Sequence, residues 1–204
     1  MVTGFRTDRP LALFAVSGPV VFTGAWWVLG NLTPGYDQLS TSISSIAMVG
    51  SPFATAMLVA FAWQGCAQLA AAAVVLRHGH RPVAVALACA GAGTLAVAAL
   101  PLPGAGGAAW LGVAHTVAAV LAFGGLHAAA LLGALDRGLP RWARVLGGAV
   151  LAVALPNTSW FVVALGTGAT GYGSGYAEKL MTTVLLVFTT ALVAEVTPRR
   201  PRVP

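Results

Sequence analysis

Six long apolar segments divide the 204-residue chain, and each is long enough to cross roughly 30 Å of hydrocarbon as a helix. They cover residues 10–30, 53–76, 83–100, 109–135, 145–165 and 177–196. Only 8% of the residues are charged, whereas soluble domains carry about 25%, so a soluble fold would lack the polar groups to cover its surface. The sequence therefore predicts an all-α fold: a polytopic membrane bundle of six transmembrane helices in a single domain over residues 1–204.

Arginine residues mark both termini and every second connection between these segments. They are Arg6, Arg9, Arg77, Arg81, Arg137, Arg141, Arg144, Arg199, Arg200 and Arg202. The alternate connections contain only one basic residue, Lys179, which lies at the edge of the last connection. The positive-inside rule therefore predicts that both termini face the cytoplasm. The clustering also argues against nucleic-acid binding, because it forms no continuous basic stripe. The Arg-rich and Ala-rich composition indicates a multi-pass protein of a bacterial inner membrane, with the lipid bilayer as its main partner.

The longest polar stretch, residues 31–45, follows the first apolar segment and contains no Lys or Arg. With about 1.5 Å of rise per helical residue, several polar side chains of other segments fall in the same outer leaflet. Ionisable groups in a membrane are costly and are functional candidates by default. The candidate catalytic residues are Asp37, His115 and Glu178. The candidate ligand-binding residues are Tyr36, Asn157, Trp160, Tyr176 and Lys179, with Tyr172 at a similar depth. The polar stretch would then cover an outward-facing site.

Each of these residues also has a purely structural interpretation. Asp37 follows a Pro-Gly pair and is a common turn residue. Glu178 and Lys179 open the last segment, where Glu favours the helix dipole and Lys can extend to the interface. A buried His115 can bond a backbone carbonyl, and Asn157 can satisfy groups freed by the preceding proline. The aromatic side chains are typical of the interfacial belt.

The sequence predicts no metal or cofactor site. His115 and His127 lie far apart on one segment, so they cannot share a metal ion. Haem between helices would need histidines that face each other from different helices. The Gly-rich residues 166–176 lack the Gly-Lys-Ser/Thr ending of a phosphate-binding loop.

Short motifs near the outer leaflet resemble a family of small bacterial membrane proteins catalogued as domain of unknown function 998. They are Pro34-Gly35-Tyr36 with Ile43-Ser44, His115 early in the fourth segment, and Gly175-Tyr176-Ala177-Glu178-Lys179-Leu180 at the start of the sixth. The resemblance covers nearly the whole chain and implies a six-helix membrane fold, but no activity. Lys179 stands where the family usually has Arg. Residues 100–104 lack the Asp that the family tends to carry, so no shared catalytic role is implied for that loop.

Two classes of function are compatible with these features. In the first, a lipid-like or isoprenoid small molecule binds from the outer leaflet, and Asp37 or Glu178 acts as an acid with His115 as its partner, as in small membrane-embedded cyclases. In the second, the protein is a non-catalytic subunit or accessory protein. Gly91 and Gly93 then allow close helix contact within the fold, in a homo-oligomer or with a membrane partner. A transporter is less consistent, because six short helices leave little room for a path.

Overall fold

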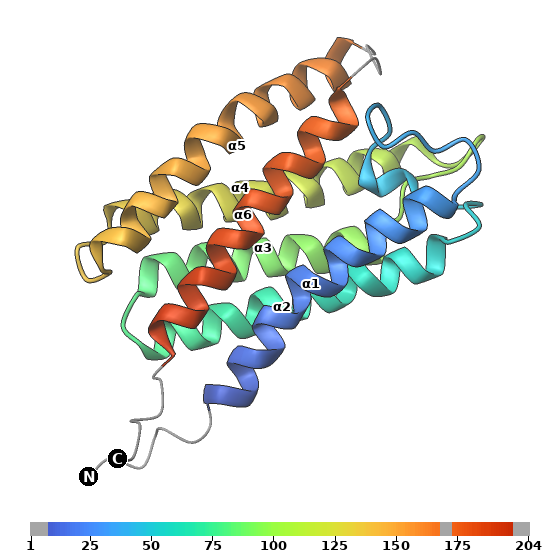
Figure 1. The fold of residues 1–204 in the computed structure, drawn as a ribbon. Coiled ribbons are helices and arrows are strands. Elements are labelled where there is room, and N and C mark those ends of the chain that lie inside the picture. Colours follow the sequence, from blue (N-terminus) through green and yellow to red (C-terminus); the bar gives the residue numbers. More distant parts are fainter. Residues whose placement is uncertain (1–7, 168–172, 198–204) are drawn as a thin grey trace.

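The computed structural model describes residues 8–167 and 173–197, which form six long helices and one short 3-10 helix (Figure 1). They are α1 (Asp8–Leu32), η1 (Ile43–Ser45), α2 (Ala54–Arg77), α3 (Arg81–Ala99), α4 (Ala109–Leu135), α5 (Arg141–Thr167) and α6 (Ser174–Val196). All six α-helices are long and apolar enough to cross a membrane. No strand occurs in the described ranges, so the predicted all-α fold with six membrane-length helices is confirmed. Arg6, Tyr172, Arg199, Arg200 and Arg202 lie outside the described residues.

The predicted segment boundaries differ from the helices mainly at α5 and α6. α5 begins at Arg141, whereas the apolar pattern predicts a start at residue 145. Its first turn carries Arg141, Trp142 and Arg144, whose apolar stems and polar ends suit the membrane interface. α6 begins at Ser174 instead of residue 177. Hydropathy identifies the part of a helix that crosses hydrocarbon, but it misses the polar turns that continue beyond that part.

Helices that follow one another in the chain pack side by side (Figure 1). α1 packs on α2, α2 on α3, α3 on α4, α4 on α5, and α5 on α6. α6 also contacts α1, α2, α4 and η1, whereas little of α5 is buried. The last helix therefore closes the bundle against the first, and α5 lies at its periphery.

Glycine residues set the distance between α3 and its neighbours. A Cβ atom on Gly93 would overlap the backbone of Ala122 in α4, and one on Gly125 would overlap the backbone of Ala90 in α3. A Cβ atom on Gly91 would lie 2.9 Å from the carbonyl oxygen of Gly65 in α2. The close helix contact predicted at Gly91 and Gly93 is confirmed, and it occurs within the fold.

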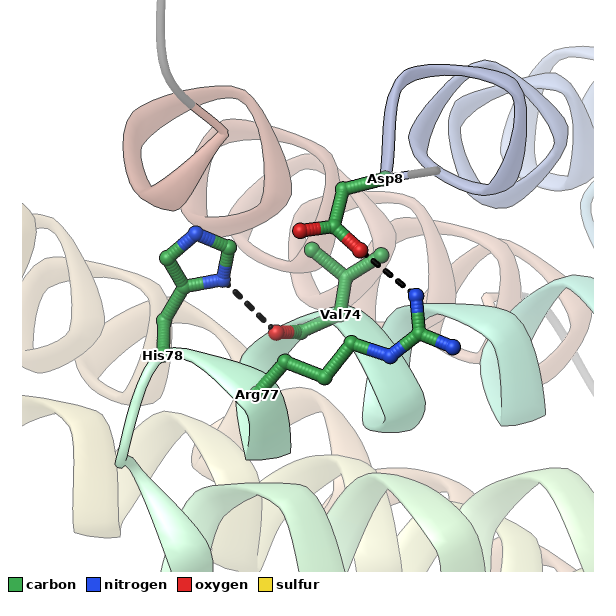
Figure 2. A network of polar contacts seen from close by, with 4 residues as sticks. All are labelled: Asp8, Val74, Arg77 and His78. Atoms are coloured by element: carbon green, nitrogen blue, oxygen red, sulfur yellow. Dashed lines mark hydrogen bonds and ion pairs between the residues drawn. The ribbon is translucent and has the colours of Figure 1, made fainter. Parts of the chain in front are cut away.

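Two polar contacts lie at the end of the bundle where α1 begins and α6 ends (Figures 1 and 2). Arg77 Nη1 donates a hydrogen bond to Asp8 Oδ1 at 2.5 Å, which connects the start of α1 to the end of α2. His78 Nδ1 donates to the carbonyl oxygen of Val74 at 2.9 Å. Because the Arg77 side chain is 50% exposed, the ion pair contributes only about 0–1 kcal/mol. The ion pair therefore connects two helix ends, whereas the His78 contact lies within the end of α2.

Candidate functional site

The opposite end of the bundle, here termed the outer end, carries the loops between α1 and α2 and between α3 and α4, together with the start of α6 (Figure 1). The segment 33–53, which joins α1 to α2, is termed the outer loop. Its backbone amide at Val49 donates to the carbonyl oxygen of Leu102 at 3.0 Å, so the two loops contact each other.

Asp37 forms a local turn on the exposed side of the outer loop. Gly35 precedes it with a φ of 73°, a left-handed conformation that glycine adopts without steric cost. Asp37 Oδ1 accepts a hydrogen bond from the Leu39 amide at 3.1 Å, and Oδ2 accepts one from the Ser40 hydroxyl at 2.5 Å. The structural interpretation of Asp37 as a turn residue is therefore the one that its contacts support.

We expect acid to weaken this turn through Asp37. The hydrogen bonds from the Ser40 hydroxyl and the Leu39 amide lower the pKa of Asp37. The folded pKa thus lies below the unfolded value of about 3.9. The stabilisation is fully present above the unfolded value and is lost as the pH falls through the folded pKa. Below about pH 4 the thermal midpoint should therefore fall less in Asp37→Asn than in the unchanged protein. Identical pH profiles for the two proteins would contradict this role.

Glu178 lies beneath the outer loop, in the first turns of α6, and its side chain is only 3% exposed. Its Oε2 accepts a hydrogen bond from the backbone amide of Ile43 at 2.8 Å. Nearby, the Tyr176 amide donates to the carbonyl oxygen of Leu39 at 3.0 Å. A Cβ atom on Gly175 would overlap the backbone of Thr41. The start of α6 therefore packs directly on the backbone of the outer loop.

Lys179 is the second charged residue that α6 directs at the outer loop, and it is 5% exposed. Its Nζ donates to the carbonyl oxygens of Gln38 at 2.9 Å and Thr41 at 2.7 Å. A longer contact of 3.4 Å reaches the carbonyl oxygen of Gly175 in α6 itself. An ammonium group has three donors, so these three acceptors use all of them.

Two aromatic rings enclose the Lys179 ammonium group. Its Nζ lies 5.0 Å from the ring centroid of Tyr36 and 5.9 Å from that of Trp26, within the range of cation–π attraction. Burial, followed by the negative charges of Glu178 and Asp37, raises the pKa of Tyr36. Tyr36 therefore stays a neutral phenol and serves as part of the cage around Lys179.

His115 connects a third element to the outer loop. The residue is 4% exposed and lies in α4. Its Nδ1 donates to the carbonyl oxygen of Leu100, just after α3, at 2.7 Å. Its Nε2 lies 3.1 Å from the hydroxyl oxygen of Ser44 in η1. Glu178, Lys179 and His115 thus hold the outer loop at four positions between Gln38 and Ser44.

The remaining predicted ligand-binding residues are not brought together with this group. Asn157 Nδ2 donates to the carbonyl oxygen of Val153 in its own helix at 2.8 Å. The side chains of Trp160 and Tyr176 are 54% and 52% exposed. This placement matches the structural interpretations: a helix-bonded amide and aromatic side chains on the bundle surface.

A pocket of about 230 Å³ lies between the outer loop, the outer end of α5 and the start of α6. Its polar lining is made of hydroxyl residues, namely Ser40, Thr41, Ser42, Ser45 and Ser174, and its apolar lining is Phe161 and Leu165. None of the residues singled out from the sequence lines it. The hydroxyl-rich run was visible within the polar stretch 31–45, but nothing in the sequence pairs it with Phe161.

The described residues contain no group of three or more His, Cys, Asp or Glu side chains placed to hold a metal ion. A comparison with family models finds one that covers most of the chain: the family described as "Protein of unknown function (DUF998)" matches residues 16–195. No curated protein and no solved structure is similar enough to the chain to support a comparison.

Proposed function

The chain belongs to the DUF998 family, whose description assigns no activity, and from that premise we propose that its outer-end pocket binds the uncharged head of a lipid-like small molecule. An isoprenoid alcohol is the kind of ligand that fits this proposal. Its hydroxyl head would occupy the pocket, and its apolar tail would extend along α5 into the bilayer.

The observation that carries the proposal is the chemistry of the pocket wall. Five of its residues carry hydroxyl groups, and none of its lining residues is charged. Hydroxyl groups both donate and accept hydrogen bonds, so they suit a neutral head that does the same. A phosphate or carboxylate head would call for a cation, and Lys179 already donates to three carbonyl oxygens.

The size and position of the pocket favour a head group over a whole molecule. A volume of about 230 Å³ is below the roughly 300–1,000 Å³ of sites that enclose drug-sized ligands. Phe161 and Leu165 belong to α5, the peripheral helix. A tail that leaves the pocket beside α5 would therefore enter hydrocarbon, where it needs no protein cover.

The contacts of the three candidate catalytic residues favour binding over acid/base catalysis. Asp37 uses both oxygens within its own turn. Glu178 bonds Ile43, and His115 bonds Leu100 and Ser44. None of the three lines the pocket, so a bound head group would have no acid or base beside it.

The test fills the pocket without altering the residues that hold the loop. Ser42 adopts an extended conformation before η1, and its hydroxyl lies 2.9 Å from that of Ser45 in the same pocket wall, so it bonds none of Glu178, Lys179 and His115, which anchor the loop. Ser42→Leu should therefore leave the loop in place but weaken binding of radiolabelled geranylgeraniol to the protein in nanodiscs by about tenfold or more. Ser159→Leu is the matched control, because Ser159 is exposed on α5 and bonds only its own helix.

The charged analogue provides the second arm of the test. Geranylgeranyl phosphate should bind more weakly than the alcohol, because burying a charge without a partner is costly. The absence of saturable alcohol binding by the unchanged protein, or equal binding by Ser42→Leu, would overturn the proposed function.

A further inference from the structure

A second and smaller cavity lies on the other side of the outer loop, among the helices. Its volume is about 40 Å³, above the roughly 10–15 Å³ that one water molecule requires. Most of its lining is apolar, with the rings of Phe22, Phe61 and Phe123. Its polar lining comes from Ser44 in η1 and from Glu178 and Thr182 in α6. None of these residues lines the larger pocket.

Glu178 brings a partly bonded carboxyl group to this cavity. Its Oε2 accepts the hydrogen bond from Ile43, whereas its Oε1 forms no hydrogen bond to any residue in the ranges 8–167 and 173–197. The residue is 3% exposed. A buried polar atom without a partner is costly, and such atoms in folded proteins are usually bonded to protein or to ordered water.

His115 fixes the direction of the hydrogen bond that it forms with Ser44. A carbonyl oxygen can only accept, so the contact with Leu100 places a hydrogen on His115 Nδ1. In the neutral ring Nε2 is then an acceptor, and the Ser44 hydroxyl must donate to it. Ser44 has only one hydrogen to give, so its oxygen can receive a bond from the cavity but cannot donate one there.

We propose that this cavity is an internal proton-binding site, in which one water molecule bridges Glu178 Oε1 and Ser44 Oγ and connects the carboxyl group to His115. The water donates one hydrogen to Ser44 Oγ and forms its second hydrogen bond with Glu178 Oε1. The cavity is large enough for it, and both oxygens lack the partner that it supplies. The site is independent of the ligand pocket and does not depend on the proposed function.

The arrangement can move one proton with all atoms accounted for. A protonated Glu178 gives its hydrogen to the water, the water gives one of its own to Ser44 Oγ, and Ser44 gives its hydrogen to His115 Nε2. The water and Ser44 each gain one hydrogen and lose one. The products are a Glu178 carboxylate and a His115 imidazolium, and no electrons are exchanged.

The charged groups around Glu178 come from α6, α4 and the outer loop. Lys179 follows Glu178 in α6. Tyr36 and Asp37 lie in the outer loop, and the charges of Asp37 and Glu178 both act on Tyr36 and Lys179. His115 faces Glu178 across Ser44. α1, α2 and α3 line the cavity with Phe22, Phe61 and Val97, which do not titrate. The nearest ammonium, on Lys179, forms no ion pair with Glu178 within the described residues. Ser44 and the water therefore form the direct connection between Glu178 and His115.

The connection can be tested by the titration of His115 in the full chain, labelled with ¹⁵N-histidine in nanodiscs. We expect Glu178→Gln to change the midpoint of the His115 titration by about half a pH unit or more. In a Ser44→Ala background the same change should have no further effect. Ser45→Ala is the matched control, because Ser45 belongs to the same short helix but lines the other pocket.

An unchanged effect of Glu178→Gln in the Ser44→Ala background, or no effect in the unchanged protein, would overturn the proposal. A measurement without any variant is also decisive. Crystallographic density should show one water within hydrogen-bond distance of both Glu178 Oε1 and Ser44 Oγ, and a dry cavity at a resolution that shows other waters would refute the site. Neither the titration nor the density depends on geranylgeraniol. Failure of the proton-site proposal can therefore be told apart from failure of the ligand proposal.

Discussion

Replacing Lys179 with methionine is expected to lower the free energy of unfolding by about 3 kcal/mol, because hydrogen bonds to a charged group contribute about 1.5–3 kcal/mol and their loss leaves buried acceptors unpaired. Methionine keeps much of the side-chain length but donates no hydrogen bond. The carbonyl oxygens of Gln38 and Thr41 would lose their donor, and the cage of Tyr36 and Trp26 would lose its cation.

The midpoint of thermal unfolding, followed by tryptophan fluorescence in detergent, should fall by about 5–10 °C. Lys179→Arg is the control, because a guanidinium group also donates several hydrogen bonds. It should retain most of the stability. Protease cleavage within the outer loop should increase in Lys179→Met and remain slow in Lys179→Arg. A methionine variant as stable as the unchanged protein would show that the loop is held without this ammonium group.

Replacing Gly93 with valine is expected to destabilise the bundle by about 3 kcal/mol or to prevent its folding, because overpacking a close contact typically costs about 1–3 kcal/mol and backbone cannot move aside as a side chain can. The added Cβ would overlap the backbone of Ala122, and the two methyl groups would extend the overlap. α3 and α4 would have to separate along their length.

Gly124→Val is the matched control for this prediction. Gly124 is exposed on α4, and a Cβ there meets nothing within 4 Å, so the same chemical change should leave the thermal midpoint almost unaltered. The yield of monodisperse protein in size-exclusion chromatography and the thermal midpoint measure both variants. Equal behaviour of the two variants would contradict a backbone-to-backbone contact at Gly93.

The six-helix fold could be predicted because hydrocarbon imposes a length and a polarity on each segment. Both properties are local in sequence and need no knowledge of packing. The early start of α5 at Arg141 escaped the prediction, because a polar turn outside the hydrocarbon has no hydropathy signal.

The candidate site could be predicted only as a grouping of residues at one end. Depth along each helix places His115 and Glu178 near the outer loop, and the structure has them there, in contact with Ser44 and Ile43. Depth does not give the direction of a side chain around the helix axis. Trp160 therefore shares the level of the site but is exposed, whereas Phe161, one residue later, lines the pocket.

The contacts of the outer loop have a consequence for the order in which the protein is built. Ile43 and Glu178 are 135 residues apart in the chain, and Thr41 and Lys179 are 138 apart. During synthesis the loop emerges after the first helix, but its two charged anchors, Glu178 and Lys179, belong to the last. The outer end of the bundle is therefore completed only when the sixth helix has joined it, and a chain that stops before α6 leaves the loop without its two charged anchors.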